Sequence, residues 1–169
     1  MKKGVEKDFV VKEKEEKMNE AKLRIADSTS VPINNIHHIV AGCKTYILVN
    51  EKNTWEDGRK ICVKMGGDIA SINTIKDQKL ILDEMKVVFP GQMSYYVGAK
   101  GDGKMFKWVT GERLEGTGFI MTSSTELENC NSSFCIVMHP NILRYPKNYG
   151  FCSHNCQSEK KATVCEVGY

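Results

Sequence analysis

The chain has 169 residues, a length that suits one domain with room for an extended arm. Its 24 basic and 21 acidic side chains leave a formal net charge of +3, too small for the concentrated basic surface of a nucleic-acid-binding protein. The 41% hydrophobic content excludes a collagen-like or disordered chain, and no apolar run approaches the roughly 18 to 20 residues that cross a bilayer.

The first 27 residues form a highly charged arm with a weak helical repeat. Val11, Met18 and Ile25 recur every seven residues, which is the spacing of a coiled-coil seam. Ala21 fills one intermediate position of this seam, whereas Lys14 interrupts the other. Because the seam covers only about two heptads, a solvated single helix and a disordered arm remain alternatives to a self-associating neck.

A change in composition divides the chain into two parts. Residues 27–32 supply helix-breaking and turn chemistry, and from about residue 40 the composition is that of a packed domain. We therefore expect a charged helical or coiled-coil neck and linker over residues 1–39 and one domain over residues 40–169. We expect the chain to form a homo-oligomer through residues 5–26.

The domain begins with a predicted strand and a predicted helix. Residues 46–49 are short, apolar and partly β-branched, which favours a buried first strand. Thr54 is a good N-cap for a helix that runs to about Met65 and ends at Gly66-Gly67. Its inner face is predicted to hold Trp55, Ile61, Cys62 and Met65.

A second helix and several short strands follow. The helix is predicted over residues 74–85, with Ile75, Leu82 and Met85 facing the core, and Pro90-Gly91 ends that unit. Strands are predicted at 95–99, 106–109, 134–138 and 162–166. Two early helices followed by short strands indicate an α+β fold.

Four segments in this order resemble the C-type lectin-like domain family over residues 40–167. The first pairs Thr54-Trp55-Glu56-Asp57-Gly58-Arg59-Lys60-Ile61-Cys62 with Met65-Gly66-Gly67-Asp68-Ile69-Ala70-Ser71-Ile72; the others are Tyr95-Tyr96-Val97-Gly98-Ala99, Phe106-Lys107-Trp108-Val109-Thr110-Gly111 and Ala162-Thr163-Val164-Cys165-Glu166. The resemblance implies two helices with small antiparallel sheets and a long loop.

The resemblance also implies a pattern of disulfides and a subgroup. It pairs Cys62 with Cys165 and Cys135 with Cys156. The first bond closes a loop of about 100 residues, which should raise the free energy of unfolding by about 4 to 5 kcal/mol. A neck that leads directly into the first strand, without an extra N-terminal hairpin, is most similar to the collectin arrangement. In that group the neck forms trimers, which raises the avidity of weak sites.

The family's motifs for calcium-dependent sugar binding are missing. These motifs are Glu-Pro-Asn or Gln-Pro-Asp in the long loop and Trp-Asn-Asp before the penultimate cysteine, where this chain has Phe151-Cys152-Ser153. The loop over residues 117–131 contains no proline. Calcium needs six to eight oxygen ligands, so Glu126, Glu128 and Asn129 alone do not predict a tight site. We expect no metal and no cofactor.

The three remaining cysteines suggest further bonds. Cys130 and Cys152 remain near one another once the family disulfides are assigned, and we predict a third disulfide between them in place of the metal. The alternative is a zinc site that uses these two with Cys135 and Cys156, although its spacings are unusual. Cys43 is either a buried free thiol in the first strand or an interchain link.

Surface residues of the later loops are the predicted ligand contacts. Tyrosine and arginine are typical of protein-binding hot spots. The candidate contacts are Glu126, Glu128, Asn129, Arg144, Tyr145, Lys147 and Tyr149. Asn131 begins a triplet that accepts N-linked glycans. His37-His38 is interpreted as part of a linker that does not bind metal.

These features together predict a non-enzymatic extracellular recognition module. It binds a protein or cell-surface ligand without calcium, as adhesion or immune-type receptors of the resembled family do. The alternatives are a glycan-binding lectin with a degenerate or metal-free site and a structural or matrix oligomer. Disulfides require an oxidising compartment, so we expect a secreted protein or an ectodomain whose leader or anchor lies outside this sequence.

Overall fold

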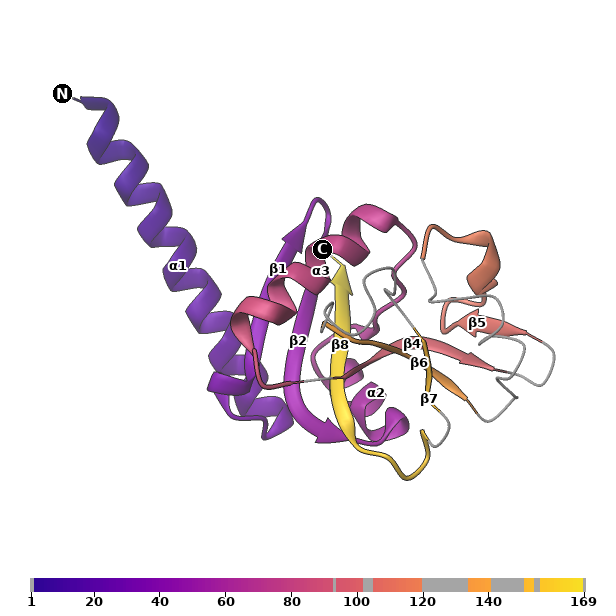
Figure 1. Cartoon of the computed structure of the whole chain (residues 1–169). Helices are drawn as coiled ribbons and strands as arrows, with labels where there is room; N and C mark the ends of the chain where they lie inside the picture. The colour runs from indigo at the N-terminus through magenta and orange to yellow at the C-terminus, as the bar shows by residue number, and fades with distance from the viewer. Residues whose placement is uncertain are drawn as a thin grey trace.

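The computed structural model describes residues 2–92, 94–101, 105–119, 134–140, 151–153 and 156–168, with the side chains of 2–9 and 151–153 excepted. Three helices accompany a sheet of eight described strands (Figure 1). The elements are α1 Lys2–Thr29, η1 Ile33–Asn35, β1 Ile36–Ala41, β2 Lys44–Asn53, α2 Trp55–Lys64, β3 Asp68–Ile69, α3 Ile75–Val88, β4 Tyr95–Gly101, β5 Phe106–Trp108, η2 Leu114–Gly116, β6 Cys135–Met138, β7 Phe151–Ser153 and β8 Lys161–Gly168.

The sheet is mixed rather than wholly antiparallel. Its strand order is β1-β2-β8-β4-β6-β7, with β3 added to β8 and β5 added to β4. The pair β4 and β8 is parallel, and every other strand pair is antiparallel. No hairpin joins β4 to β8, so no tight turn imposes an antiparallel pairing on them. This one pair corrects the prediction of antiparallel sheets, while the α+β class is confirmed.

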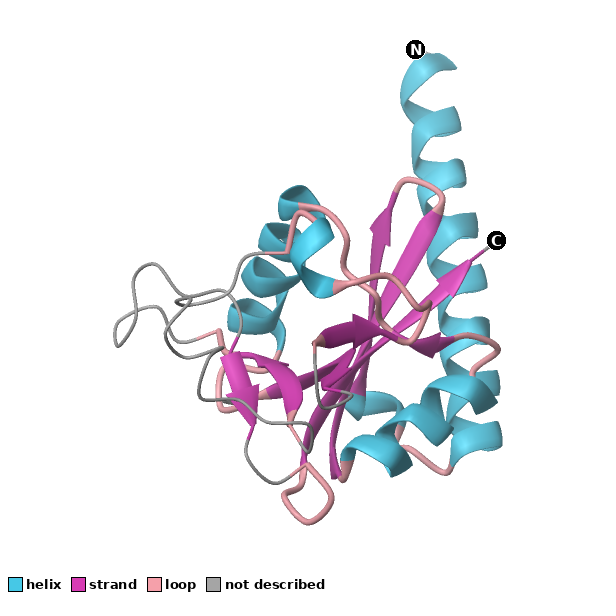
Figure 2. Cartoon of the chain, turned by 90° about the vertical axis from the view of Figure 1, so that its right-hand side faces the viewer, coloured by secondary structure: helices cyan, strands magenta, loops and turns pink. Residues whose placement is uncertain are grey.

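The sheet has a hydrophobic cluster on each face. Along β2, Tyr46 and Leu48 belong to one cluster, whereas Ile47 and Val49 belong to the other, as the two-residue period of a strand requires. Helix α3 packs on the first face, and α2 with the end of α1 packs on the second (Figure 2). A strand covered on both faces explains why residues 46–49 are continuously apolar.

The two domain helices agree with the sequence, with one exception. The Thr54 hydroxyl accepts a hydrogen bond from the Asp57 backbone N–H and caps α2, and Gly66 ends it with a φ of 88°. Thr74 caps α3 in the same way. Ile75 was predicted to face the core but is 42% exposed, because the first helical residue lies at the rim of the packed face.

The structure has an N-terminal hairpin that the sequence analysis did not predict. Strand β1 precedes β2 and pairs antiparallel with it, so the prediction that the arm leads directly into the strand at residues 46–49 is wrong. His37 and His38 belong to β1 rather than to a linker, and His37 Nε2 lies 2.8 Å from Glu84 Oε2 on α3. The predicted boundary at residues 39 and 40 falls inside this strand.

Helix α1 is continuous and only partly covered by the domain. Its C-terminal part lies beside β1 and β2, and its N-terminal part projects away from the domain (Figure 1). Ile25 and Ala26 pack against the cluster beneath α2. Val11, by contrast, is 54% exposed. No helix in the described part of the chain is both long enough and apolar enough to span a membrane.

Two disulfides tie the domain together. One links Cys62 on α2 to Cys165 on β8, and the other links Cys135 on β6 to Cys156. Both pairs are those that the family resemblance implies. Cys43 is a free, exposed thiol in the turn between β1 and β2, so the alternative of a buried thiol is wrong.

Candidate functional site

The predicted ligand residues lie outside the described parts of the chain. They fall in residues 120–133 and 141–150, and this set comprises Glu126, Glu128, Asn129, Asn131, Arg144, Tyr145, Lys147 and Tyr149. The two segments are attached to opposite ends of β6, which with four residues is about 10 Å long. The described framework therefore fixes where each segment begins and ends.

Two buried phenylalanines flank residues 120–133 in the sequence. Phe119 and Phe134 are each 7% exposed and belong to the same hydrophobic cluster. The Phe134 carbonyl accepts a 2.9 Å hydrogen bond from the Gly101 N–H of β4. Gly118 donates to the Asn73 carbonyl at 2.9 Å, and a Cβ at Gly118 would lie 3.0 Å from that oxygen.

Trp108 supports the start of the same segment. Its ring meets Phe119 edge to face, with ring centroids 5.1 Å apart and an interplanar angle of 83°. Its indole N–H donates to the Thr117 hydroxyl at 3.3 Å, and that hydroxyl donates to the Leu114 carbonyl at 2.7 Å. These contacts fix the backbone that immediately precedes residue 120, and binding residues are often carried by loops attached to such packed scaffolds.

Strand β7 consists of the three residues that the family resemblance aligns with the Trp-Asn-Asp motif. It pairs with β6 so that Cys152 lies opposite Ile136 and Ser153 opposite Cys135. Phe151 and Cys152 offer no side-chain oxygen and Ser153 offers only a hydroxyl, so this strand lacks the carboxylate and amide oxygens that a calcium ion takes. In the described residues no cluster of three or more His, Cys, Asp or Glu side chains could hold a metal ion.

The structure tests the zinc alternative but not the predicted third disulfide. The Cys135–Cys156 disulfide removes two of the thiolates that the zinc alternative requires. Cys130 and the side chain of Cys152 lie outside the described parts, so their disulfide stays a prediction.

A cationic cluster around Trp55 was not predicted. The Trp55 indole N–H donates to the Val97 carbonyl at 2.9 Å, and Arg59 and Lys100 lie over the ring at 5.8 and 5.0 Å from its centroid. Arg59 forms a two-point ion pair with Asp68. Burial acts to raise the pKa of Asp68, but hydrogen bonds from Arg59 and from the Ile69 N–H outweigh it and lower that pKa.

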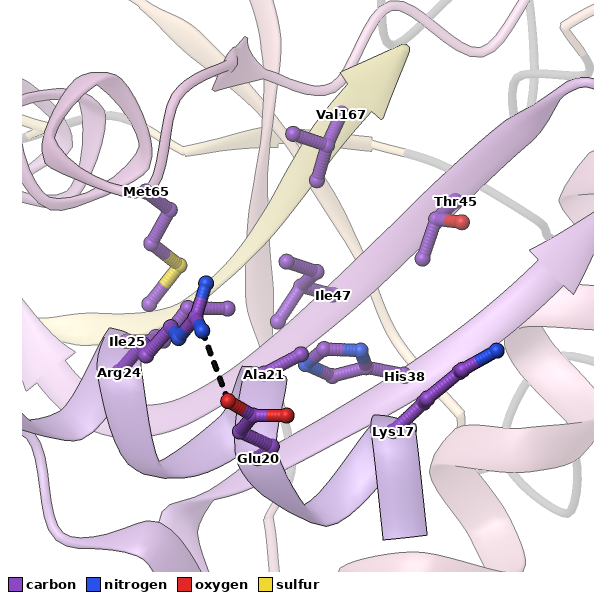
Figure 3. A pocket seen from close by; sticks show the side chains of 10 residues that line it. All are labelled: Lys17, Glu20, Ala21, Arg24, Ile25, His38, Thr45, Ile47, Met65 and Val167. Carbon is purple, nitrogen blue, oxygen red and sulfur yellow. Dashed lines mark hydrogen bonds and ion pairs between the residues drawn. The ribbon is translucent and has the colours of Figure 1, made fainter. Parts of the chain in front are cut away.

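A separate pocket of about 340 Å³ lies where α1 meets the sheet (Figure 3). Its walls come from α1 on one side and from β1, β2, β8 and the end of α2 on the other. Burial, followed by the positive charges of Lys22 and His37, lowers the pKa of His38 in its wall to about 4. Sequence reasoning missed this site because it placed His38 in a linker.

Comparisons with known proteins cover most of the domain. The family profile described as the lectin C-type domain matches residues 51–167. No curated protein sequence matches the chain significantly.

Solved structures share the fold at low sequence identity. A complex of SPL-1 with GlcNAc has a TM-score of 0.64 and 14% identity, covering 77% of this chain and 91% of the other. The Ca²⁺-independent C-type lectin SPL-2 from Saxidomus purpuratus has a TM-score of 0.63 and 14% identity, covering 77% and 90%. A calcium-independent type II antifreeze protein has a TM-score of 0.59 and 17% identity, covering 78% and 91%.

Proposed function

The chain belongs to the lectin C-type domain family, and from this membership we propose that it is an extracellular recognition domain that binds a protein or cell-surface ligand without calcium. The family is generally non-enzymatic, and we assign no reaction to this member. The two disulfides suit an oxidising compartment. Adhesion or immune-type recognition is the role that we propose for it.

The composition of β7 is the observation that carries the proposal. The domain has both implied disulfides and the β6–β7 pair, yet Cys152 and Ser153 stand where the family motif has Asn and Asp, whose amide and carboxylate oxygens would bind calcium. Calcium affinity depends on the number of such ligands and their charge. The side chains at 126, 128 and 129 alone offer too few oxygen ligands for a tight site, whereas the arginine and tyrosines at 144–149 offer contacts that need no metal.

Helix α1 and Cys43 are proposed to display the domain as an oligomer. The projecting part of α1 carries exposed apolar side chains at Val10 and Val11, and Cys43 is exposed on the β1–β2 turn. We propose self-association through residues 5–26 and an interchain disulfide through Cys43. Light scattering and non-reducing electrophoresis of the wild type and Cys43→Ser test both: a monomeric wild type with a free thiol contradicts them.

A calcium titration and a binding assay test the recognition proposal. We expect the same melting temperature with calcium and with a chelator, because calcium would raise the melting temperature only if it bound the native state. We expect binding to ligand-bearing cells to survive the chelator and to fall about tenfold or more in Arg144→Ala and Tyr145→Ala. Lys64→Ala, which removes an exposed cation at the end of helix α2, is the matched control. Binding that the chelator abolishes contradicts the proposal.

Metal-free glycan binding is the second candidate. Two structures with this fold are described as a GlcNAc complex and as a Ca²⁺-independent lectin, so the scaffold is compatible with such a site. A glycan array probed in the presence of a chelator distinguishes the candidates. Saturable signals for defined glycans favour the lectin, and a protein captured from the ligand-bearing cells favours the receptor.

A further inference from the structure

The pocket beside α1 has an apolar interior built from four elements. Ala21 and Ile25 come from α1, Ile47 from β2, Met65 from the end of α2 and Val167 from β8. The small Ala21 side chain leaves the gap between the helix and the sheet. Its volume of about 340 Å³ lies at the lower end of the range of small-molecule pockets, roughly 300 to 1,000 Å³. The pocket thus favours a small, mainly apolar ligand.

Two polar groups in the pocket wall have no hydrogen-bond partner among the described residues. Thr45 is 2% exposed, and its hydroxyl is buried and unpaired. The Nε2 atom of His38 is also buried and unpaired. An unpaired buried hydroxyl costs about 1 to 3 kcal/mol. Such groups call for an explanation, and a ligand that hydrogen-bonds to them supplies one.

The register of the hairpin brings these two groups to one end of the pocket. His38 lies opposite Ile47, and Thr45 lies opposite Val40, so His38 and Thr45 are diagonal neighbours on the same face of β1 and β2. The backbones of diagonal neighbours are about 7 Å apart, so the two side chains are close enough to contact one small head group.

The charges around the pocket favour an anion. Lys17 and Arg24 line it together with Glu20, and the positive charge of Lys22 acts on His38. Lys17 pairs with Glu13 at 2.8 Å, and Arg24 pairs with Glu20 at 2.7 Å (Figure 3 shows the second pair). Among the charged residues that line the pocket, two cations against one carboxylate leave a surplus of one positive charge.

We propose that this pocket binds a small amphipathic carboxylate, with its apolar part between α1 and the sheet and its head group bonded to Thr45 and His38. At roughly 30 Å³ for each non-hydrogen atom, as for water, the pocket holds about ten such atoms. Octanoate has this size. The pocket lies beside α1, and α1 lies on the side of the domain away from β5, β6 and β7 (Figure 1).

Calorimetry with octanoate and octanol tests the proposal on the full chain. We expect octanoate to bind one saturable site with a Kd of about 10 μM to 1 mM, as for a ligand of this size. Octanol, which lacks the charge, is expected to bind at least about tenfold more weakly, because hydrogen bonds to charged groups are the stronger ones. No saturable binding of octanoate at about 10 mM overturns the proposal.

Three variants locate the site. Thr45→Val keeps the shape and removes the hydroxyl, and we expect octanoate to bind about 10- to 100-fold more weakly. Ala21→Phe fills the gap and is expected to abolish binding, while Thr110→Val at an exposed turn is the matched control and is expected to bind as the wild type does.

Each variant result has a definite meaning. Equal binding by Thr45→Val and the wild type overturns the head-group assignment, and binding retained by Ala21→Phe overturns the location. Should Thr45→Val fail to fold, Ala21→Phe and octanol decide, because the substitution at 21 lies on a half-buried helical position outside the sheet.

Discussion

Replacing Thr45 by valine is predicted to stabilise the unliganded protein. The residue is 2% exposed in β2, and its hydroxyl has no partner in the described part of the chain. Folding therefore removes this hydroxyl from water without compensation, at a cost of about 1 to 3 kcal/mol. Valine has the same branched shape and strand preference and does not carry this cost. We expect the free energy of unfolding to rise by about 1 kcal/mol, which corresponds to about 2 to 4 °C in melting temperature.

Urea unfolding followed by circular dichroism measures this change, and a second threonine provides the control. The hydroxyl of Thr74 accepts a hydrogen bond from the Asp77 N–H at 3.1 Å, so Thr74→Val removes a helix cap and should cost about 1 kcal/mol. The two substitutions are chemically identical, yet the structure predicts opposite signs. A Thr45→Val protein less stable than the wild type would refute the reasoning, because it would mean that the hydroxyl has a partner in the unliganded state.

Three further predictions concern the framework. Cys62→Ala with Cys165→Ala should lower the free energy of unfolding by about 4 to 5 kcal/mol, because that disulfide closes a loop of 103 residues. Cys135→Ala with Cys156→Ala should lower it by about 3 kcal/mol, because its loop spans 21 residues. Denaturation of both double variants without reductant checks this order. Gly98→Ala should cost about 1 to 3 kcal/mol, since its Cβ would lie 2.7 Å from a backbone carbonyl oxygen, whereas Gly91→Ala, with open space around it, should change melting little. The native pKa of His38, at about 4, lies below the usual 6.5, so the unfolded chain binds the proton first and stability falls as pH drops from 6.5 to 4. Because the side chain is partly exposed we expect about 1 kcal/mol, and a wild type and His38→Gln pair with equal pH dependence would contradict it.

The parts of the fold that follow local rules could be predicted from the sequence. Helix α2 has its cap at Thr54, its apolar stripe and its terminating Gly66 within a dozen residues, so every signal that specifies it is local. Strand β1 has no such signal. It is an edge strand with a histidine pair in its middle, and it exists because β2 offers unpaired backbone groups on its free side.

The candidate site divides in the same way. The loss of calcium ligands at residues 151–153 is a matter of residue identity and is visible in the sequence. The pocket beside α1 cannot be read from the sequence, because its lining residues lie far apart along the chain. They include Ala21, His38, Thr45, Met65 and Val167. Only the pairing of β2 with both β1 and β8, and the packing of α1 across them, bring these residues together.

The seven-residue repeat of α1 has a second meaning that the structure makes visible. Spacing of this kind marks one apolar face of a helix, and it does not specify whether another copy or the same chain covers that face. Here Ala21 and Ile25 face the domain of their own chain, whereas Val11 in the same stripe remains exposed. A partner helix that contacts the entire stripe would have to displace α1 from the sheet and open the pocket. Self-association through the projecting part of α1 leaves the pocket intact, and it is therefore the form of oligomer that is compatible with ligand binding beside Thr45.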